Sequence, residues 1–380
     1  MNKTLIYIAI AILFSCSPNP EKKMYYDLVA TDTKIEFDLD EHTTNNVYAS
    51  QLYMDKDDGI EYLVFQNSII PRLLFYNMKT GEFVREARYS LEGPDGIPKF
   101  AGFTIKSKDE IYLTDLTFQG ISVVDWDGRL KKRIPSKRVD DGKHLYILMT
   151  SEDITLIGDS LYCCLAIDQE NNVSDRLKNS PLCGVLNTKN GEIRTLPFSY
   201  FDVTKKEDPG YIVIYYCRCF DGERFIYSFT QADEIYVSDI SHEHVKKINI
   251  KNKYWPHREI PLQQINSQTY RQMLEAGEYG LLSYDQYRDV YYRIIYPPCE
   301  IDPHVNLEEL SNGGRGEFDI LILDKDFHVI GERKMPKNTY SSRVFLIRED
   351  GVYISESYYL NPDFDEDKLV LRKFDLVERK

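Results

Sequence analysis

Short runs of alternating apolar and polar residues dominate the chain, and many of them are rich in Tyr, Ile, Val and Phe. An alternation with a period of two puts every second side chain on the same face, which is typical of a β-strand with one buried side. Short turns that contain Asp, Asn, Lys or Gly separate these runs. The pattern therefore predicts an all-β protein.

One hairpin recurs along the chain, in which an apolar strand is followed by a turn that begins with Asp or Asn and then by a more polar strand. It occurs at residues 73–82, 121–129, 184–192, 235–244 and 320–328. A further pair of strands, joined by a tight turn, precedes each of these hairpins. Units of four strands that repeat every few tens of residues are typical of the blades of a β-propeller.

The repeated units predict a six-bladed β-propeller, with seven blades as the alternative. The expected blades are at residues 60–90, 100–135, 153–197, 213–250, 280–335 and 343–376. The last unit has only three strands, and the alternating segment Lys34–Leu39 supplies a candidate for the fourth. We expect this N-terminal strand to close the ring, since pairing of the two chain ends removes a free sheet edge.

The lengths of the connections distinguish the two faces of the expected ring. Short turns belong to one face, and the long connections belong to the other, at residues 136–152, 167–181, 197–212, 251–279, 297–316 and 358–367. Residues 261–276 within them are expected to form a short helix that ends at Gly277. Because long loops on a rigid scaffold often carry binding residues, we expect function at this face and at the mouth of the central channel.

The first residues have the pattern of a lipoprotein signal peptide. Lys3 precedes an apolar run from Leu5 to Phe14, which is too short to span a bilayer, and the run ends in the lipobox-like sequence Leu13-Phe14-Ser15-Cys16. We expect cleavage before Cys16 and a lipid on its thiol, with an uncleaved amphiphilic N-terminus as the alternative. Ser17 after the cysteine favours the outer membrane, by analogy with sorting in enteric bacteria.

Three regions follow from this pattern: a signal peptide at 1–15, the lipidated cysteine with a flexible tether at 16–32, and a single propeller domain at 33–380. The mature chain is long for one compact core, but propellers exceed the usual domain size. The net charge of −14 argues against nucleic-acid binding, which requires a basic surface.

Six cysteines remain besides Cys16, and their spacing matches neither a disulfide framework nor a zinc site. In an exported protein, Cys163 or Cys164 could form a bridge with Cys183. Buried free thiols are the favoured alternative.

Candidate ligand-binding residues lie in one loop and on strands that are expected near the channel. They are Gly93, Pro94, Asp95, Gly96, Tyr216, Arg218, Tyr292, Arg293 and Tyr358. Tyrosines there could stack against sugars, although tyrosine is also a common strand residue that packs in cores and at edges.

Metal-binding patterns are weak, and the sequence predicts no cofactor. Asp363, Asp365 and Asp367 alternate as in a calcium loop, but Lys368 and Phe374 replace the expected glycine and glutamate. The pair His242 and His244 is expected in a solvated turn. The sequence contains no catalytic serine, cysteine or zinc-protease motif.

The stretch Glu92–Phe100 lies between the first two expected blades and contains Gly93, Pro94, Gly96 and Phe100. With the lipobox and the repeated units, it resembles the TolB-like six-bladed propeller lipoproteins of Bacteroidetes and the related NHL-type repeats, in which a Gly-Pro-x-Gly-x-x-x-Phe stretch leads into a blade. Later blades lack this stretch. The resemblance implies a propeller lipoprotein of uncharacterised function.

Two functions are consistent with the sequence. The first is a non-catalytic binding or scaffolding lipoprotein of the cell envelope, whose partner is a glycan, a peptide or a protein. The alternative is an envelope hydrolase or lyase with its site at the channel mouth.

Overall fold

The computed structural model describes residues 25–379 except 48, 68, 98, 116–119, 136–137, 140–142, 145, 149–153, 167–180, 205–215, 231, 251–266 and 313. The expected signal peptide, Cys16 and the first part of the expected tether therefore lie outside the described residues. Among the described helices, none is long and apolar enough to cross a membrane.

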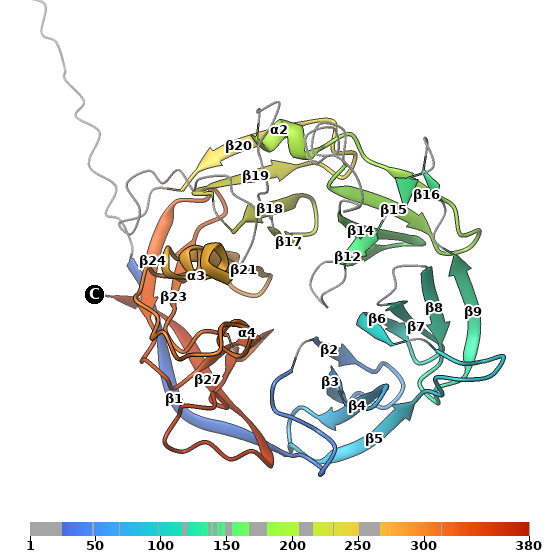
Figure 1. The fold of residues 1–380 in the computed structure, drawn as a ribbon, viewed down its shortest axis with the longest axis horizontal. Coiled ribbons are helices and arrows are strands. Elements are labelled where there is room, and N and C mark those ends of the chain that lie inside the picture. The colour runs from blue at the N-terminus through green and yellow to red at the C-terminus, as the bar shows by residue number, and fades with distance from the viewer. Residues whose placement is uncertain are drawn as a thin grey trace, which may run out of the picture.

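Antiparallel sheets follow one another around a central axis, and the first strand of each group lies innermost (Figure 1). One sheet contains β2 (Ser50–Met54), β3 (Glu61–Gln66), β4 (Arg72–Asn77) and β5 (Phe83–Arg88). The next contains β6 (Phe100–Ser107), β7 (Glu110–Asp115), β8 (Gly120–Val124) and β9 (Leu130–Pro135). A further sheet contains β17 (Tyr216–Phe220), β18 (Phe225–Phe229), β19 (Glu234–Ser238) and β20 (Val245–Asn249). The fold is all-β and propeller-like.

Between β9 and β17 the strands are less regular. The pair β10 (Arg138–Val139) and β11 (Lys143–His144) forms a small sheet, and a five-stranded sheet contains β12 (Tyr146–Leu148), β13 (Thr155–Ile157), β14 (Ser160–Ala166), β15 (Cys183–Asn187) and β16 (Ile193–Thr195). We expected a loop at 136–152, and this was wrong for β10 to β12. The long strand β14 accommodates both β12 and β13 along one edge, so its partner strand is divided into two pieces.

The remaining strands form one sheet in the order β21-β22-β23-β24-β1-β27-β26-β25. Their bounds are β21 (Glu278–Asp285), β22 (Val290–Tyr296), β23 (Asp319–Leu323), β24 (Val329–Lys334), β25 (Ser341–Arg348), β26 (Gly351–Ser355), β27 (Lys368–Arg379) and β1 (Tyr25–Asp38). The N-terminal strand β1 pairs antiparallel with β27 from Tyr25 opposite Arg379 to Asp38 opposite Lys368. At its start β1 also meets β24 in parallel, with Tyr26 opposite Gly331.

Strand β1 is longer than expected. Residues 25–32, which we assigned to the flexible tether, form its first half, interrupted by an irregularity between Ala30 and Lys34. The sequence shows only the alternating half of the strand. The first half is held by pairing with β27, a partner more than 340 residues away that local patterning does not reveal.

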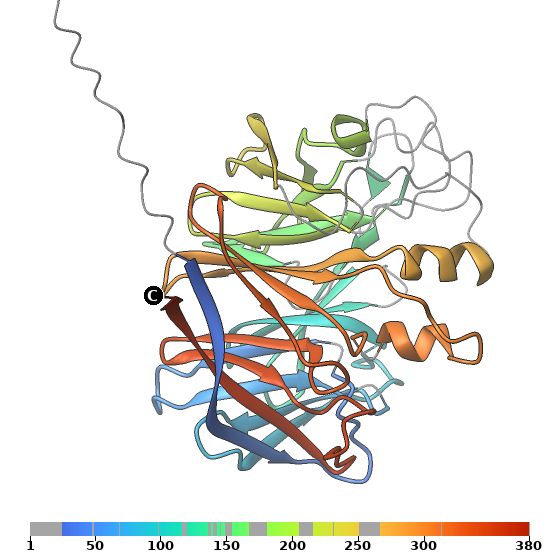
Figure 2. The same cartoon turned by 90° about the vertical axis from the view of Figure 1, so that its left-hand side faces the viewer.

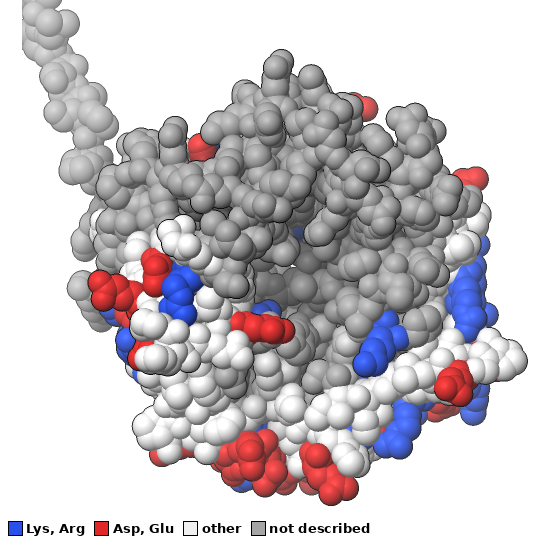
Figure 3. All heavy atoms as spheres, viewed as in Figure 1, with Lys and Arg blue, Asp and Glu red and all other residues white. Residues whose placement is uncertain are grey.

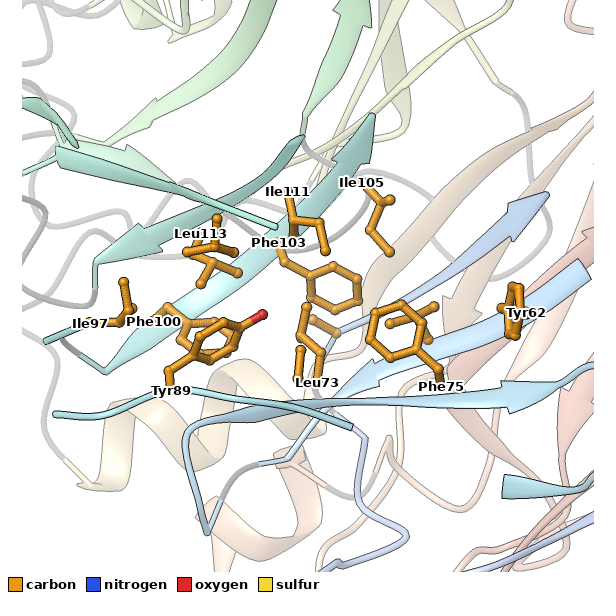
Figure 4. Packing of buried hydrophobic residues seen from close by; sticks show 14 residues of the cluster. Tyr62, Leu73, Phe75, Tyr89, Ile97, Phe100, Phe103, Ile105, Ile111 and Leu113 are labelled. Carbon is orange, nitrogen blue, oxygen red and sulfur yellow. The ribbon is translucent and has the colours of Figure 1, made fainter. Parts of the chain in front are cut away.

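The core lies between neighbouring sheets. Figure 4 shows one such interface, in which Leu73 and Phe75 of β4 pack against Phe103 of β6 and against Ile111 and Leu113 of β7. The residues that alternate with them, such as Leu74 and Tyr76 of β4, are buried in a second cluster on the other side of the sheet. Burial of large apolar side chains at about 25 cal/mol per Å² makes such interfaces the main stabilising contribution to the fold.

The turns of the recurring hairpins are built by their first residue. The side-chain oxygens of Asn77, Asp125, Asn187 and Asp324 each accept hydrogen bonds from backbone N–H groups two to four residues later. Such Asx turns explain why Asp or Asn opens these four hairpins.

A residue with positive φ follows in each turn, and in three turns it is glycine. Gly81 has a φ of 76° and lies against the backbone of Glu36 in β1, and Gly128 lies in the same way against Arg88 in β5. Gly191 lies against Ile134 in β9. Each glycine therefore faces the outer strand of the preceding sheet, and for the first hairpin this strand is β1.

Within the described residues, the connections contain the helices α2 (Tyr200–Thr204), α3 (Ser267–Glu275) and α4 (Leu307–Asn312). The expected helix at 261–276 corresponds to α3, and its residues 261–266 lie outside the described residues. The sequence did not predict α2 or α4. We call the end of the ring with α3, α4 and connections 67–71, 89–99, 297–318 and 356–367 the loop face.

The first and last described residues lie away from the loop face. Figure 2 shows α3 and α4 projecting at one side, whereas the start of β1 and the C-terminus lie at the opposite side. This agrees with strand direction, because β27 leaves the loop face at Lys368 and reaches Arg379 beside Tyr25. Tyr25, the first described residue, therefore lies at the end opposite the loop face.

Candidate functional site

The helix α3 is fixed to the connection that follows β22. Arg271 of α3 donates hydrogen bonds to the carbonyl oxygens of Ile301 at 2.9 Å, Asp302 at 3.1 Å and Pro303 at 3.2 Å. The N–H of Cys299 donates to the carbonyl of Glu275 at 2.9 Å. The helix and the connection form one connected part of the loop face.

Arg315 joins α3 to the underlying sheet. Its guanidinium donates to the carbonyl of Leu274 at 3.1 Å and to the Glu278 carboxylate at 2.7 Å, and it lies 4.9 Å from the centre of the Tyr296 ring. The side chain is buried and its partners are charged, polar and aromatic, so it holds α3 against β21 and β22.

A second part of the loop face lies where β1 leads into β2. The buried Arg72 donates to the Asp40 carboxylate at 2.7 Å and to Thr43 Oγ1 at 2.9 Å. Asn67 donates to the carbonyl of His42 at 2.8 Å, and Asn45 donates to the carbonyl of Asp365 at 3.2 Å. Burial tends to raise the pKa of Asp40, but the Arg72 guanidinium holds it below its ordinary value. These contacts connect the loop 67–71 to the connection 356–367.

Exposed apolar side chains stand on these anchored loops. Ile69 is 57% exposed, Leu91 is 50% exposed and Leu360 is 50% exposed. Figure 3 views the loop face and shows wide uncharged areas between scattered charged side chains on its described part. Single exposed apolar residues are ordinary, but these three lie on loops of one face, and we take them as candidate contact residues. We call Ile69, Leu91 and Leu360 the apolar contact set.

The Gly93-Pro94-Asp95-Gly96 stretch lies on the loop face beside Leu91. Arg133 of β9 donates to the carbonyl of Gly96 at 2.6 Å and to that of Pro94 at 3.2 Å, while Gly93 has a φ of 92°. The structure therefore places this stretch where we expected it. Its role as a ligand-binding loop stays a prediction.

Tyr216 and Arg218 are buried between two sheets instead of lining an open surface. Tyr216 donates to the carbonyl of Leu182 at 2.5 Å. Arg218 is 1% exposed and donates to Cys183 Sγ at 2.9 Å and to the carbonyl of Tyr162 at 2.8 Å. These contacts run from β17 to β14 and β15, so both side chains hold neighbouring sheets together.

Tyr292 and Arg293 are buried in the same manner. Tyr292 donates to Asp285 at 3.1 Å, and burial raises its pKa. Arg293 donates to Ser228 Oγ at 2.9 Å and to the carbonyls of Asp233 at 2.9 Å and Ala232 at 2.7 Å. Burial lowers the pKa of Arg293 to about 10. Arg293 thus connects β22 to the preceding sheet.

Tyr358 is buried beneath the loop face, where its ring packs against Gly316 and lies 4.9 Å from the Tyr359 ring centre. Any side chain at position 316 would overlap the Tyr358 ring. The sequence placed Tyr216, Arg218, Tyr292 and Arg293 on the correct strands, but it did not show that neighbouring sheets enclose them.

The candidate calcium ligands Asp363, Asp365 and Asp367 lie in an exposed turn. The Asp365 carboxylate accepts a hydrogen bond from the N–H of Asp367 at 3.0 Å. Across the residues that the structure describes, no three His, Cys, Asp or Glu side chains are grouped so that they could hold a metal ion.

His242 was expected in a solvated turn, and this was wrong. His244 is exposed, but His242 is 1% exposed and its Nε2 lies 2.5 Å from Tyr227 Oη. His242 takes the positive-φ position that glycine occupies in three other hairpins, with a φ of 60°, and this turns its ring inward. Burial lowers the pKa of His242 to about 4. The sequence signal that could have revealed this burial is that His242 stands at the turn position that glycine occupies in three of the other hairpins.

The amino-acid pattern and the fold agree with a known family. The model for a domain of unknown function, DUF4221, matches residues 25–334. A crystal structure of a member of this family from Bacteroides vulgatus has a TM-score of 0.82 and 22% identity, over 94% of this chain and 100% of that chain.

A second crystal structure shows a more distant likeness. A protein from Bacteroides fragilis that carries the name of an exported protein has a TM-score of 0.56 and 12% identity, over 94% of this chain and 96% of that chain. At these identities the two structures support the fold alone. No curated protein matches the sequence. On the family match over most of its length, the chain belongs to the DUF4221 family, a domain of unknown function.

Proposed function

We propose that this protein is an exported lipoprotein, anchored through Cys16, whose propeller is a non-catalytic binding or scaffolding domain of the cell envelope. The observation that carries the proposal is the position of the loop face at the end opposite Tyr25 and Arg379. A tether that joins the fold at Tyr25 presents the loop face away from the membrane, where it is accessible to a partner.

The proposal includes a closed six-bladed ring, as the resemblance to TolB-like lipoproteins implies. The pairing of β1 with β27, the packing of Gly81 against Glu36 and the ion pair of Arg348 with Glu61 at 2.7 Å support closure. A closed ring has no free edge and gives the loops a rigid base. The structurally similar protein from Bacteroides fragilis carries the name of an exported protein, and we extend this property to the present chain as part of the proposal.

The apolar contact set favours a protein or peptide partner over a glycan. Ile69, Leu91 and Leu360 are aliphatic, and the exposed aromatic ring beside Leu360 in sequence is Tyr359, at 36% exposure. The anchored loops need little ordering when a partner binds, which lowers the entropic cost of association. Outer-membrane localisation remains part of the proposal and rests on Ser17.

Anchoring is tested by Cys16→Ser in the native host. The wild-type chain should enter the detergent phase and carry the mass of a lipid on an N-terminal cysteine. The variant should lose that mass and leave the membrane fraction. An unmodified, uncleaved N-terminus in the wild-type protein would contradict the proposed anchor.

Binding is tested with envelope-wide cross-linking of the wild-type protein and of two variants, each of which places an aspartate at an exposed position. Leu360→Asp changes the loop face, and Tyr287→Asp changes a residue of similar exposure, 48%, in a turn at the opposite end. A partner of the loop face should be lost with Leu360→Asp and kept with Tyr287→Asp. Equal loss in both variants, or turnover of an envelope substrate by the purified chain, would argue against the proposal.

A further inference from the structure

Two cysteines occupy directly opposite positions on neighbouring strands. Cys164 of β14 is the cross-strand partner of Cys183 of β15. Both are buried, at 1% and 0% exposure, and both belong to the apolar cluster that includes Tyr216. Cys163 belongs to a different cluster on the other face of the same sheet. The side chains of Cys164 and Cys183 therefore share one face, and that of Cys163 does not.

The hydrogen bonds around this pair define its type. The carbonyl of Cys183 accepts from the N–H of Leu196 at 2.9 Å, so it points to β16 and away from β14. The bond between β14 and β15 is made one position further on, from the N–H of Leu165 to the carbonyl of Leu182 at 3.0 Å. Cys164 and Cys183 thus form a non-hydrogen-bonded pair.

Such pairs bring the two residues close together. In an antiparallel sheet the Cα atoms of a non-hydrogen-bonded pair lie about 4.5 Å apart. A disulfide links Cα atoms that are about 4.4–6.8 Å apart. The register therefore places this pair within the range of Cα separations that a disulfide spans. Arg218, whose guanidinium donates to Cys183 Sγ, lies in the same enclosed site.

We infer that Cys164 and Cys183 form a cross-strand disulfide when the chain folds in an oxidising compartment. In vivo this rests on the proposed export. A bond forms between the two sulfurs, and the two thiols lose two protons and two electrons. The electrons reduce the disulfide bond of an oxidant, which is either a thiol–disulfide oxidoreductase or glutathione disulfide. Because both thiols are buried in the folded chain, the exchange takes place before β14 and β15 are covered by β17.

The bond would join the two strands across the 18 residues between them. A cross-link that closes such a loop reduces the conformational freedom of the unfolded chain and so stabilises the fold.

The test refolds the full chain carrying Cys16→Ser with glutathione disulfide, blocks the remaining thiols in denaturant and counts them by intact mass. We expect two protected thiols and a linked peptide pair that contains Cys164 and Cys183. Cys164→Ser and Cys183→Ser should each abolish the protection. Cys163→Ser, its neighbour on the opposite face, should retain it. Six free thiols, or a link that requires Cys163, would overturn the inference.

A second measurement separates this inference from the proposed export. Thiols are blocked in intact cells, and the chain is recovered from the cytoplasmic and envelope fractions. Protection of the same pair in the envelope fraction supports both proposals. A chain found only in the cytoplasm with free thiols contradicts export, while the refolded chain still decides whether the geometry forms the bond.

Discussion

Tyr227 Oη lies 2.5 Å from Nε2 of His242, in the interior of the β17–β20 sheet. The other ring nitrogen, Nδ1, faces the carbonyl of Ile240 at 3.3 Å. Burial raises the pKa of Tyr227 and lowers that of His242 to about 4, so both groups are neutral at pH 7. The neutral imidazole with its proton on Nδ1 can then accept the hydrogen bond from the tyrosine.

This pair predicts a loss of stability at acidic pH. The unfolded chain binds a proton at His242 near pH 6.5, whereas the folded chain resists protonation until about pH 4. The contribution of His242 is therefore fully present above pH 6.5 and declines as the pH falls toward 4, by up to about 3 kcal/mol. Urea unfolding between pH 4 and pH 7.5 measures this decline.

The matched variants are His242→Asn and His244→Asn, in the same turn. Asn tolerates the positive φ of position 242 and does not titrate. His242→Asn should be less stable than the wild type at pH 7, and this difference should shrink toward pH 4. A constant difference across the range would show that His242 does not titrate in this way. His244→Asn controls for removal of an exposed imidazole.

The close packing of Gly81 against β1 allows a prediction of how much this contact contributes to the stability of the fold. Gly81→Ala should destabilise the fold because alanine is strained at a φ of 76° and its Cβ would overlap the Glu36 carbonyl. Gly59→Ala carries the same backbone strain at a φ of 70° but meets no neighbouring atom. We expect about 1 kcal/mol for Gly59→Ala and about 2–4 kcal/mol for Gly81→Ala in chemical unfolding. Equal losses would mean that β1 moves to accommodate the methyl group.

Arg293 was a candidate ligand-binding residue, but its buried contacts predict that substitution lowers the stability of the fold. Arg293→Met removes the group that donates hydrogen bonds to Ser228 and to the carbonyls of Ala232 and Asp233. These acceptors then stay in the interface between sheets without the bonds from Arg293. Chemical unfolding should show a loss of about 2–4 kcal/mol. Arg129→Met, at a site 73% exposed, should stay within about 0.5 kcal/mol of the wild type. A stable Arg293→Met protein would argue for a functional role of this arginine.

The ion pair between Arg348 of β25 and Glu61 of β3 predicts coupling between the last and first sheets. The two side chains are 17% and 21% exposed and 2.7 Å apart. A double-mutant cycle with Arg348→Met and Glu61→Gln should give a coupling energy of about 1 kcal/mol that decreases with salt. The exposed pair of Lys189 and Asp159 should give almost none. Absence of coupling for Arg348 and Glu61 would count against a closed ring.

Local patterning predicted much of the fold because propeller strands follow one another in sequence. The Asx turns at Asn77 and Asp125 lie within single hairpins, and short-range hydrogen bonds determine them. The sequence did not predict that β14 pairs with both β12 and β13, nor that β1 begins at Tyr25. Both depend on pairing with segments whose position only the assembled sheets define.

The candidate site was predicted only in part. The position of the Gly93–Gly96 stretch on the loop face follows from strand direction, which the sequence order fixes. The burial of Tyr216 and Arg218 does not, because an alternating strand indicates two faces but not which neighbour covers each of them.

The sequence by itself determined the strands and turns of the recurring hairpins, since these depend on residues close in the chain. Only the tertiary structure decided that arginines on inner strands join neighbouring sheets, that His242 turns inward, and that Tyr25 lies opposite the loop face. These properties depend on contacts between residues far apart in the chain, and the energy of burying a polar side chain is set by the partners that the folded sheets bring to it.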